Sequence, residues 1–257
     1  MKKILNDSGI FEFGVVPFDI LKEHLHSFAS KDRLPQNAQS VAVMLFPYLT
    51  KPSKRNISLY AVVPDYHKII GDKLNLVCEA LKAEYKEYSF VHFCDNSPVM
   101  EVKSAALAGL GVIGKNNLLI NKTFGSYVFI AEIVTDMPLE YSVHEIKYCN
   151  GCNKCVKACP SKALCGEFKK DLCLSYITQK KEPLSKDEEA LIKKTGIIWG
   201  CDICSESCPM NARAKMTNIK EFLDGAQPII TNENYNKIKD RAYAWRGEKV
   251  IKRNINI

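Results

Sequence analysis

Most of the cysteines in this 257-residue chain fall into two short runs whose spacing is typical of iron–sulfur cluster ligands. The first run is Cys149-x2-Cys152-x2-Cys155-x3-Cys159-Pro160, and the second is Cys201-x2-Cys204-x3-Cys208-Pro209. In the bacterial ferredoxin pattern, three cysteines of a run hold one cluster, and the fourth, before the proline, ligates the other cluster. The two runs therefore predict two [4Fe–4S] clusters.

Two such clusters need eight thiolates in all, and the second run is one cysteine short. We expect Cys173, between the runs, to supply it. The predicted ligands are Cys149, Cys152, Cys155 and Cys208 for one cluster and Cys159, Cys173, Cys201 and Cys204 for the other. A pair of zinc sites is the alternative, because zinc also binds four thiolates from C-x2-C pairs. Three cysteines at successive three-residue steps before a Cys-Pro favour clusters, and a disulfide framework is the weakest interpretation.

Cysteine usage also predicts the compartment, because thiolates that hold clusters must stay reduced. The first residues, Met1 to Asp7, reach an acid before any apolar stretch of signal-peptide length. No segment approaches the ~20 apolar residues of a membrane span. We therefore expect a cytoplasmic protein that does not enter a membrane, and a monomer.

The charge of the chain is uneven. Its formal value is +7, and because each cluster with its four thiolates carries about −2, two clusters would lower it to about +3. From Pro209 to the end, ten Lys or Arg face five Asp or Glu, a balance of +5. Such a basic end either contacts the phosphates of an RNA or forms the solvated faces of terminal helices.

The residues before the cysteines read as an α/β domain, and the whole chain, with 46% hydrophobic residues, can fill an ordinary core. Apolar periodicity predicts helices over residues 18–28, 67–85 and 101–108. Apolar runs predict strands over residues 41–46, 88–93 and 127–134, and residues 117–120 look extended. On the 67–85 helix, Cys78 is expected to be a core thiol.

Two local motifs are similar to known cofactor-binding motifs, but neither is interpreted as a binding site. Gly109-x-Gly111-x-x-Gly114 matches a dinucleotide-binding fingerprint, but it follows a helix rather than a strand, so these glycines are expected to allow tight turns or close backbone approach. The string from Asp65 to Gly71 is similar to a loop whose histidine binds cobalt in some corrinoid enzymes. Its glycine comes one residue late, so His67 is interpreted as structural.

Several longer strings, in order over residues 40–212, carry a resemblance to a known family. They are Ile57-Ser58-x-Tyr60-Ala61, Asp65-Tyr66-His67, Asp95-Asn96-Ser97-Pro98-Val99-Met100-Glu101, the stretch from Ala108 to Ile120, Gly125-Ser126, the stretch from Glu132 to Asp136, the stretch from Cys173 to Thr178, and Gly200-Cys201-Asp202-x-Cys204. With these strings the chain resembles the epoxyqueuosine reductases, and more distantly the corrinoid-dependent reductive dehalogenases.

The resemblance implies an α+β fold class. A nitroreductase-like α/β domain that binds base-off cobalamin (residues 1–140) would precede a bacterial ferredoxin-like module with two [4Fe–4S] clusters (residues 141–215) and a short, basic helical tail (residues 216–257). The implied activity is that of an oxidoreductase that converts epoxyqueuosine to queuosine in tRNA, fed by a low-potential donor such as a ferredoxin or flavodoxin. The alternatives are a corrinoid iron–sulfur reductase of a small molecule, as in dehalogenation, and a two-cluster electron-transfer protein.

The resemblance also implies site residues. Asp95 matches the carboxylic acid that protonates the opened epoxide; without the resemblance, an N-cap or Asx turn is the simpler role for this residue. The implied cofactor contacts, in addition to Asp95, are Ser58, Met100, Lys115, Asn116, Leu119, Ile133, Ser175, Cys201 and Asp202. The apolar contacts among them could equally be core residues. Cys94 and Cys165 are expected to pack in the interior.

The chain also departs from the family pattern. Val102 stands where an arginine is common, and Val112 where an aromatic residue is common. Full-length relatives continue into helical repeats that help to hold the tRNA, whereas this sequence stops at Ile257. We expect the basic tail to take over part of that contact with RNA.

Overall fold

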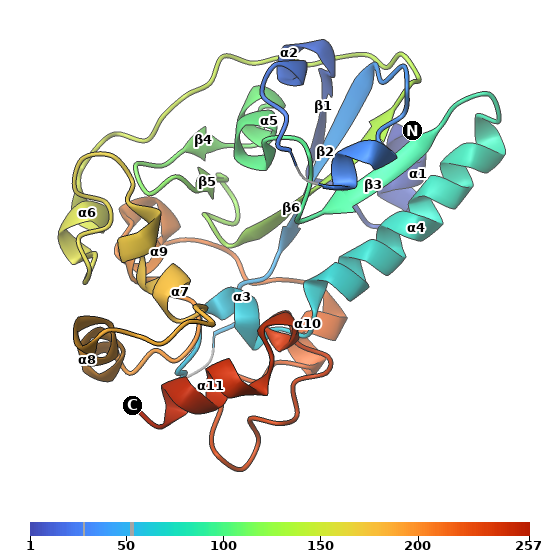
Figure 1. The fold of residues 1–257 in the computed structure, drawn as a ribbon. Coiled ribbons are helices and arrows are strands. Elements are labelled where there is room, and N and C mark those ends of the chain that lie inside the picture. Colours follow the sequence, from blue (N-terminus) through green and yellow to red (C-terminus); the bar gives the residue numbers. More distant parts are fainter. Residues whose placement is uncertain (28, 52–53) are drawn as a thin grey trace.

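A four-stranded antiparallel sheet with the strand order β1-β2-β6-β3 is the centre of the fold (Figure 1). The structure is a computed structural model that describes residues 1–27, 29–51 and 54–257. Its strands are β1 (Phe13–Pro17), β2 (Ser40–Pro47), β3 (Phe90–Cys94), β6 (Val128–Thr135) and a separate small pair, β4 (Val112–Ile113) with β5 (Leu119–Ile120). All eight residues of β2 are buried, which explains its unbroken apolar run: both faces of the sheet are covered.

One helix covers each face of the sheet. Helix α4 (Tyr66–Glu84) packs on the face that carries Ala42 and Met44, and helix α5 (Glu101–Leu107) packs on the opposite face, which carries Val41 and Val43. The strand alternation of β2 therefore separates two cores, one on each side of the sheet.

The predicted long helix is confirmed as α4. Its Ile70, Leu74, Val77, Cys78 and Leu81 are buried on one face, so Cys78 is a core thiol as expected. The Asp65 carboxylate caps its N-terminus by accepting a hydrogen bond of 3.1 Å from the His67 backbone N–H.

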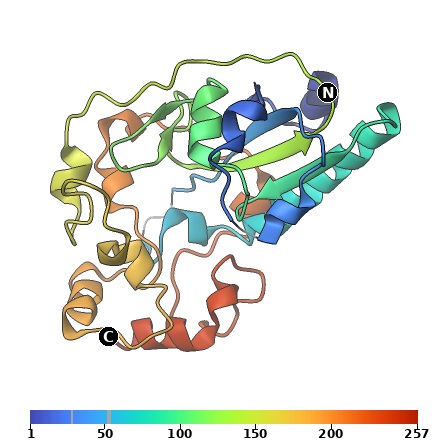
Figure 2. The same ribbon diagram turned by 45° about the horizontal axis from the view of Figure 1, so that its top comes forward.

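The other helices are short. The α-helices are α1 (Lys2–Asp7), α2 (Asp19–Lys22), α3 (Leu59–Val62), α6 (Lys154–Ala158), α7 (Leu174–Ile177), α8 (Lys186–Thr195), α9 (Ile203–Glu206), α10 (Lys220–Asp224) and α11 (Glu248–Ile255). The 3-10 helices are η1 (Ala29–Arg33), η2 (Lys170–Leu172), η3 (Pro209–Asn211) and η4 (Ala244–Arg246). The helices from α6 to α11 gather at the end of the molecule away from the N-terminus (Figures 1 and 2).

The C-terminal segment packs against both other parts of the chain. Phe222, Ile230 and Tyr243 belong to the same buried core as α4. The Asn254 side chain, on α11, donates hydrogen bonds of 2.7 and 2.8 Å to the backbone carbonyls of Thr178 and Ile198. Residues 216–257 therefore brace the cysteine-rich segment against the sheet domain.

Some of the predicted elements are wrong. Strand β1 was not predicted, and the helix predicted over residues 18–28 shrinks to α2, because Glu23, His24 and His26 are exposed and offer no apolar face to extend it. The expected end of that helix at Phe28 lies outside the described residues. Cys165 is exposed, so its expected packing role is also wrong; it lies in a bend before Gly166, whose φ is +79°.

Other expectations hold. The predicted helix over residues 101–108 and the strands over 41–46, 88–93 and 127–134 correspond to α5, β2, β3 and β6. Within residues 117–120, only the last two form a strand, and Asn117 is left-handed with φ 61°. A Cβ on Gly111 would lie 2.6 Å from the Ile120 carbonyl oxygen, so close backbone approach is confirmed there.

Among the described residues, no helix has both the length and the apolar composition needed to cross a bilayer.

We predict that Asn254→Ala destabilises the protein by about 2 kcal/mol, because two buried carbonyls lose their donor. Asn256→Ala, at an exposed position two residues further on, is the matched control and should change little. Urea unfolding of both variants measures the difference. Equal midpoints would show that the bracing bonds contribute nothing.

Candidate functional site

Four cysteines line one cavity of about 310 Å³ between the sheet domain and the cysteine-rich segment. They are Cys159, Cys173, Cys201 and Cys204. The first two adjoin the ends of α6 and α7, and the other two lie before and within α9. These are the four thiols predicted for one cluster, and the structure brings them together; their role as ligands stays a prediction.

The thiols predicted for the other cluster differ in exposure: Cys155 is buried, and Cys149 and Cys208 are half-buried. Burial and then the nearby Cys149 and Cys208 thiols raise the pKa of Cys155, which places these three together. Cys152, the fourth, is exposed, and the Lys115 backbone N–H donates a 3.3 Å hydrogen bond to Cys149 Sγ. In the described ranges, no three His, Cys, Asp or Glu side chains gather closely enough to hold a single metal ion.

An unpartnered donor lies in the wall of the thiol cavity. Asn116 lines this cavity, and its buried Nδ2 has no hydrogen-bond partner among the described residues. Burial raises the pKa of Cys204, and the Asn116 amide opposes that rise. Hydrogen-bond donors aimed at cluster sulfur atoms are a usual part of such sites, so these residues fit a [4Fe–4S] cluster.

Ser58 and Asp202, two expected cofactor contacts, also lie at the thiol cavity but satisfy each other. The Asp202 carboxylate accepts a hydrogen bond of 2.7 Å from the Ser58 hydroxyl and one of 2.6 Å from the Leu59 backbone N–H. It also pairs with Arg55 at 3.1 Å. Burial raises the pKa of Asp202, and the Arg55 charge opposes it. The two residues therefore hold α3 against the second cysteine run.

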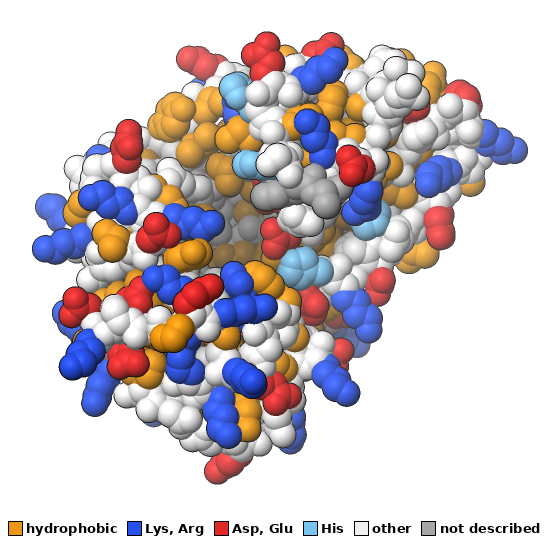
Figure 3. All heavy atoms as spheres, in the orientation of Figure 1, with side chains coloured by type: hydrophobic (Ala, Val, Ile, Leu, Met, Phe, Trp, Pro, Cys, Tyr) orange, Lys and Arg blue, Asp and Glu red, His pale blue; other side chains and the backbone are white. Residues whose placement is uncertain are grey.

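A larger cavity of about 950 Å³ adjoins the thiol cavity. Tyr48, Tyr60, Leu118 and Ser175 line both cavities and form a shared wall. The other residues of the larger cavity are Asp65, Tyr66, His67, Asp95, Asn96, Ser126, Val128, Phe129, Gln179, Arg241, Ala242, Ala244 and Trp245. Figure 3 shows the molecule hollowed near the centre of this face, with apolar side chains in the hollow. The volume of the larger cavity is at the upper end of the range for ligand cavities, so this cavity has room for a tetrapyrrole-sized ligand.

Asp95 opens into the large cavity from a strained loop. Asp95 and Asn96 have φ values of 59° and 48°, in the left-handed region that costs non-glycine residues about 1–3 kcal/mol each and is found at functional sites. Asp95 Oδ2 accepts a 2.7 Å hydrogen bond from the Tyr66 hydroxyl, and Oδ1 accepts one of 2.8 Å from the Asn96 backbone N–H. The side chain is 56% exposed, so a ligand can reach it.

His67 lies between two carboxylates. Its Nδ1 is 2.7 Å from Asp65 Oδ1, and its Nε2 is 3.2 Å from Asp95 Oδ2. Burial disfavours the charged ring, but the hydrogen bonds to both aspartates outweigh burial and raise the pKa of His67 to about 9. In Asp95, the His67 hydrogen bond outweighs burial and, with those from Tyr66 and Asn96, lowers the pKa to about 2. At neutral pH the proton is therefore on His67, and Asp95 is ionised.

The structure places His67, interpreted from the sequence as structural, on the wall of the large cavity next to Asp95. The Asp65-Tyr66-His67 string carried the signal, but the shifted glycine led sequence reasoning away from it. The aromatic residues of the cavity were missed altogether, since Tyr48, Phe129 and Trp245 come from separate segments with no common motif.

The remaining expected contacts divide by position. Ser175 lies at both cavities. Met100 and Leu119 each line a smaller cavity that also contains Asp95, of about 260 and 220 Å³. Lys115 is exposed, with its Nζ bonded at 2.7 Å to Asn153 Oδ1. Ile133 is fully buried in the core under α4, because strand alternation turns it to that face; its position gives the expected cofactor contact no support.

Comparison with known proteins gives matches over most of the chain. A family model described as "4Fe-4S double cluster binding domain" matches residues 148–211, and one described as "Epoxyqueuosine reductase QueG, DUF1730" matches residues 29–96. The chain is 36% identical over 256 residues to the epoxyqueuosine reductase of Cyclobacterium marinum, covering 92% of this chain and 81% of the relative. It is 35% identical over 226 residues to that of Leadbetterella byssophila, with coverages of 86% and 72%.

Solved structures of epoxyqueuosine reductases also match this chain over nearly its whole length. An epoxyqueuosine reductase from Streptococcus thermophilus superposes with a TM-score of 0.81 at 25% identity, covering 98% of this chain and 78% of that one. A crystal structure of epoxyqueuosine reductase with a tRNA-Tyr epoxyqueuosine-modified stem loop superposes at 0.82 and 25% identity, with coverages of 98% and 79%. These matches confirm the predicted fold class and the double-cluster module. A catabolic reductive dehalogenase reaches only 0.49 at 15% identity.

We predict that Cys173→Ser lowers the iron content of anaerobically reconstituted protein from about eight to about four atoms per chain, because one cluster loses a thiolate. Cys165→Ser, which removes an exposed thiol with no assigned ligand role, is the control and should keep about eight. Iron and sulfide analysis measures both. Zinc in the wild-type protein, or full iron in Cys173→Ser, contradicts the assignment.

Proposed function

The chain belongs to the epoxyqueuosine reductase family, and we propose that it reduces epoxyqueuosine to queuosine in tRNA, using two [4Fe–4S] clusters and a bound cobalamin. The observation that carries this proposal is the shared wall of Tyr48, Tyr60, Leu118 and Ser175 between the thiol cavity and the large cavity. A cluster on one side and a large flat ligand on the other would be immediate neighbours. A low-potential ferredoxin or flavodoxin is the proposed external donor, and the protein is proposed to act as a monomer.

The residues of the large cavity suit a corrinoid. Tyr66 stacks on Phe129 with ring centroids 3.9 Å apart, which presents an aromatic wall. Bound there, cobalamin would supply a strongly reducing metal centre. The residues that line the cavity would hold that ligand and limit the access of water to it, and Asp95, which lines the same cavity, would be within reach of a substrate bound there.

The protein must also protonate the oxygen that an opened epoxide leaves. With a pKa of about 2, Asp95 alone is a poor acid at neutral pH. His67, with a pKa of about 9, holds a proton 3.2 Å from the Asp95 carboxylate. We propose that the two act as a pair: His67 stores the proton, and Asp95 passes it to the substrate oxygen.

The rim of the large cavity suits an RNA strand. Trp245 is 61% exposed, and the Arg246 guanidinium lies 3.7 Å from its ring centroid. Arg241 lines the same cavity. Exposed aromatic rings beside arginine are platforms for unpaired bases, and the related structure with a bound stem loop supports tRNA as the substrate.

The deciding experiment supplies tRNA from a strain that lacks epoxyqueuosine reduction to protein loaded with iron, sulfide and cobalamin. Mass spectrometry of the digested tRNA should show epoxyqueuosine converted to queuosine. Protein that binds cobalamin but leaves the tRNA unchanged would contradict the proposed substrate.

We predict that Asp95→Asn keeps cobalamin but slows turnover by about 10²–10⁴-fold, because the proton path to the oxygen is cut. Asp72→Asn, at an exposed position on α4, is the control.

We predict that the activity of the wild-type protein falls only as His67 loses its proton near pH 9. In His67→Asn, which lacks this proton store, the activity should begin to fall at a lower pH. Coinciding pH profiles of His67→Asn and wild type would exclude His67 as the proton store.

We predict that Trp245→Ala raises the KM for an epoxyqueuosine stem loop about tenfold, because stacking on one base contributes ~1–3 kcal/mol. Trp245→Phe keeps an aromatic surface and should remain close to wild type. Steady-state kinetics with the stem loop test both. An unchanged KM in the alanine variant would remove Trp245 from the RNA contact.

A further inference from the structure

The proposed reaction needs more protons than the His67–Asp95 pair holds. In loss of an epoxide oxygen as water, the oxygen gives up both C–O bonds and gains two O–H bonds, while the two carbons form a double bond. The balance is two electrons and two protons. The His67–Asp95 pair stores one proton, on His67. A second proton source must therefore lie within reach of Asp95.

Two carboxyl groups buried behind Asp95 have no assigned role. Glu132 lies in the middle of β6, opposite Val43 and Phe93, and is 0% exposed. Neither of its carboxyl oxygens has a hydrogen-bond partner among the described residues, and Oε1 of Glu101 is likewise buried without one. Burying a carboxylate that lacks partners on one or both oxygens costs several kcal/mol, so burial favours the neutral, proton-bearing form of both groups.

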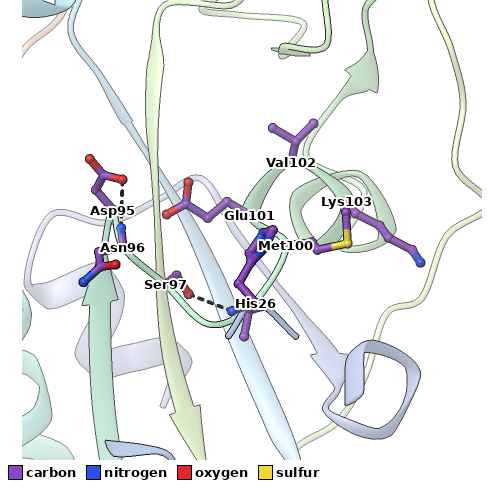
Figure 4. Close-up of a pocket in the computed structure, with 9 residues that line it drawn as sticks. His26, Asp95, Asn96, Ser97, Met100, Glu101, Val102 and Lys103 are labelled. Atoms are coloured by element: carbon purple, nitrogen blue, oxygen red, sulfur yellow. Dashed lines mark hydrogen bonds between the residues drawn. The ribbon is translucent and has the colours of Figure 1, made fainter. Parts of the chain in front are cut away.

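Glu101 is placed to serve Asp95. It is the first residue of α5, and in Figure 4 its side chain points back toward the Asp95 loop. The Asp95 backbone N–H donates toward its carboxyl group. Two cavities of about 260 and 220 Å³ are each lined by both residues, which leaves room for a bridging water.

The charges around the pair set the direction of proton flow. Burial, and then the Asp95 charge, raise the pKa of Glu101 to about 8. Burial, and then Glu101, raise the pKa of Glu132 well above its usual value, and the Ser97 hydroxyl opposes this only in part. The other titratable groups that face this region are Asp65, just before α4, Tyr66 and His67 from α4, Cys94 from β3, and His26 and Lys103, which line the cavity of about 260 Å³.

The order of events follows from His67. Its hydrogen bond is the largest cause that holds the pKa of Asp95 down. Once His67 has given up its proton, that cause weakens, and Asp95 can accept a proton from Glu101.

Resting on the function proposed above, we propose that Glu101 is the second proton source of this site, that its burial and the Asp95 charge keep it protonated, and that its proton reaches the substrate oxygen through Asp95. The first proton comes from His67 through Asp95 as the first C–O bond breaks. The second leaves with the oxygen as water when the second C–O bond breaks, and the two electrons would come from bound cobalamin reduced by the clusters. Glu101 acts through Asp95 and does not touch the substrate; it regains its proton from solvent.

Infrared spectroscopy tests the stored protons without any turnover. Wild-type protein should show the carbonyl absorption of protonated carboxyl groups at pH 7, with one component lost near pH 8. Glu101→Gln should lack that component, and Glu132→Gln should lack a second one that persists to higher pH. Glu79→Gln, at an exposed position on α4, is the control. Absence of protonated carboxyl absorption at pH 7 in wild type would overturn the proposal.

Single-turnover kinetics test the use of the proton. Gln at position 101 keeps an oxygen that accepts the Asp95 N–H, so Glu101→Gln removes the proton while preserving the loop. Its rate on prebound tRNA should fall about 10²-fold, and the rate in H2O–D2O mixtures should change from a two-proton to a one-proton dependence. Glu101→Asp should restore part of the rate.

The outcomes separate this inference from the proposed function. If wild type forms queuosine and Glu101→Gln matches it in rate and isotope dependence, the inference fails alone. If wild type leaves epoxyqueuosine unchanged, the proposed function fails, and the infrared result still decides whether Glu101 and Glu132 store protons.

Discussion

The wall that separates the thiol cavity from the large cavity is the constraint on which the rest of the structure depends. Electrons can pass between two redox groups only if these lie close together, so the cysteine-rich segment must sit firmly on the sheet domain. The contact is backbone to backbone: the Ser58 N–H donates a 2.8 Å bond to the Trp199 carbonyl. A Cβ on Gly200 would lie 2.4 Å from Ser58 Cβ, and the φ of Gly200 is +68°. Only glycine allows the second cysteine run to approach α3 this closely.

Side chains lock the same contact. The indole N–H of Trp199 donates a 2.8 Å hydrogen bond to the Tyr60 hydroxyl, in the shared wall itself. The Asn211 side-chain amide donates a hydrogen bond of 2.7 Å to the Ser126 hydroxyl, and its oxygen accepts one of 2.9 Å from the Ser126 backbone N–H. Buried hydrogen bonds of this kind fix one relative placement of two packed parts. The C-terminal segment adds its own bonds through Asn254, so three parts of the chain converge on the two cavities.

How much of this the sequence could predict depends on how local each signal is. The cysteine spacing reflects how a short loop wraps a cluster, so the thiols could be predicted, and the four assigned to one cluster line one cavity. Their role as ligands stays a prediction. Strand β2 was predictable because burial on both faces leaves an unbroken apolar run. Helix α4 was predictable because burial on one face leaves apolar residues at three- and four-residue steps. The position of Ile133 could not be predicted in the same way. The sequence showed its residue type and its place in a string shared with the family. The face of β6 on which it lies is set by pairing with β2 and β3, which are distant in the sequence. Trp245 and Phe129 meet at one cavity only through the fold.

The buried acids follow from a conflict of charge. Asp65 and Asp95 contact His67, and Glu101 and Glu132 lie behind Asp95; a single positive charge cannot support four carboxylates in a poorly solvated region. The structure resolves this by pairing the two aspartates with His67 and burying the two glutamates, with no partner for Glu101 Oε1 or for either oxygen of Glu132 among the described residues. The aspartates are therefore ionised and the glutamates neutral. A site that consumes protons gains from this arrangement, because proton-bearing groups lie behind an ionised Asp95 that faces the cavity. The hydrogen bonds to two aspartates keep the proton on His67, and burial keeps the protons on the two glutamates.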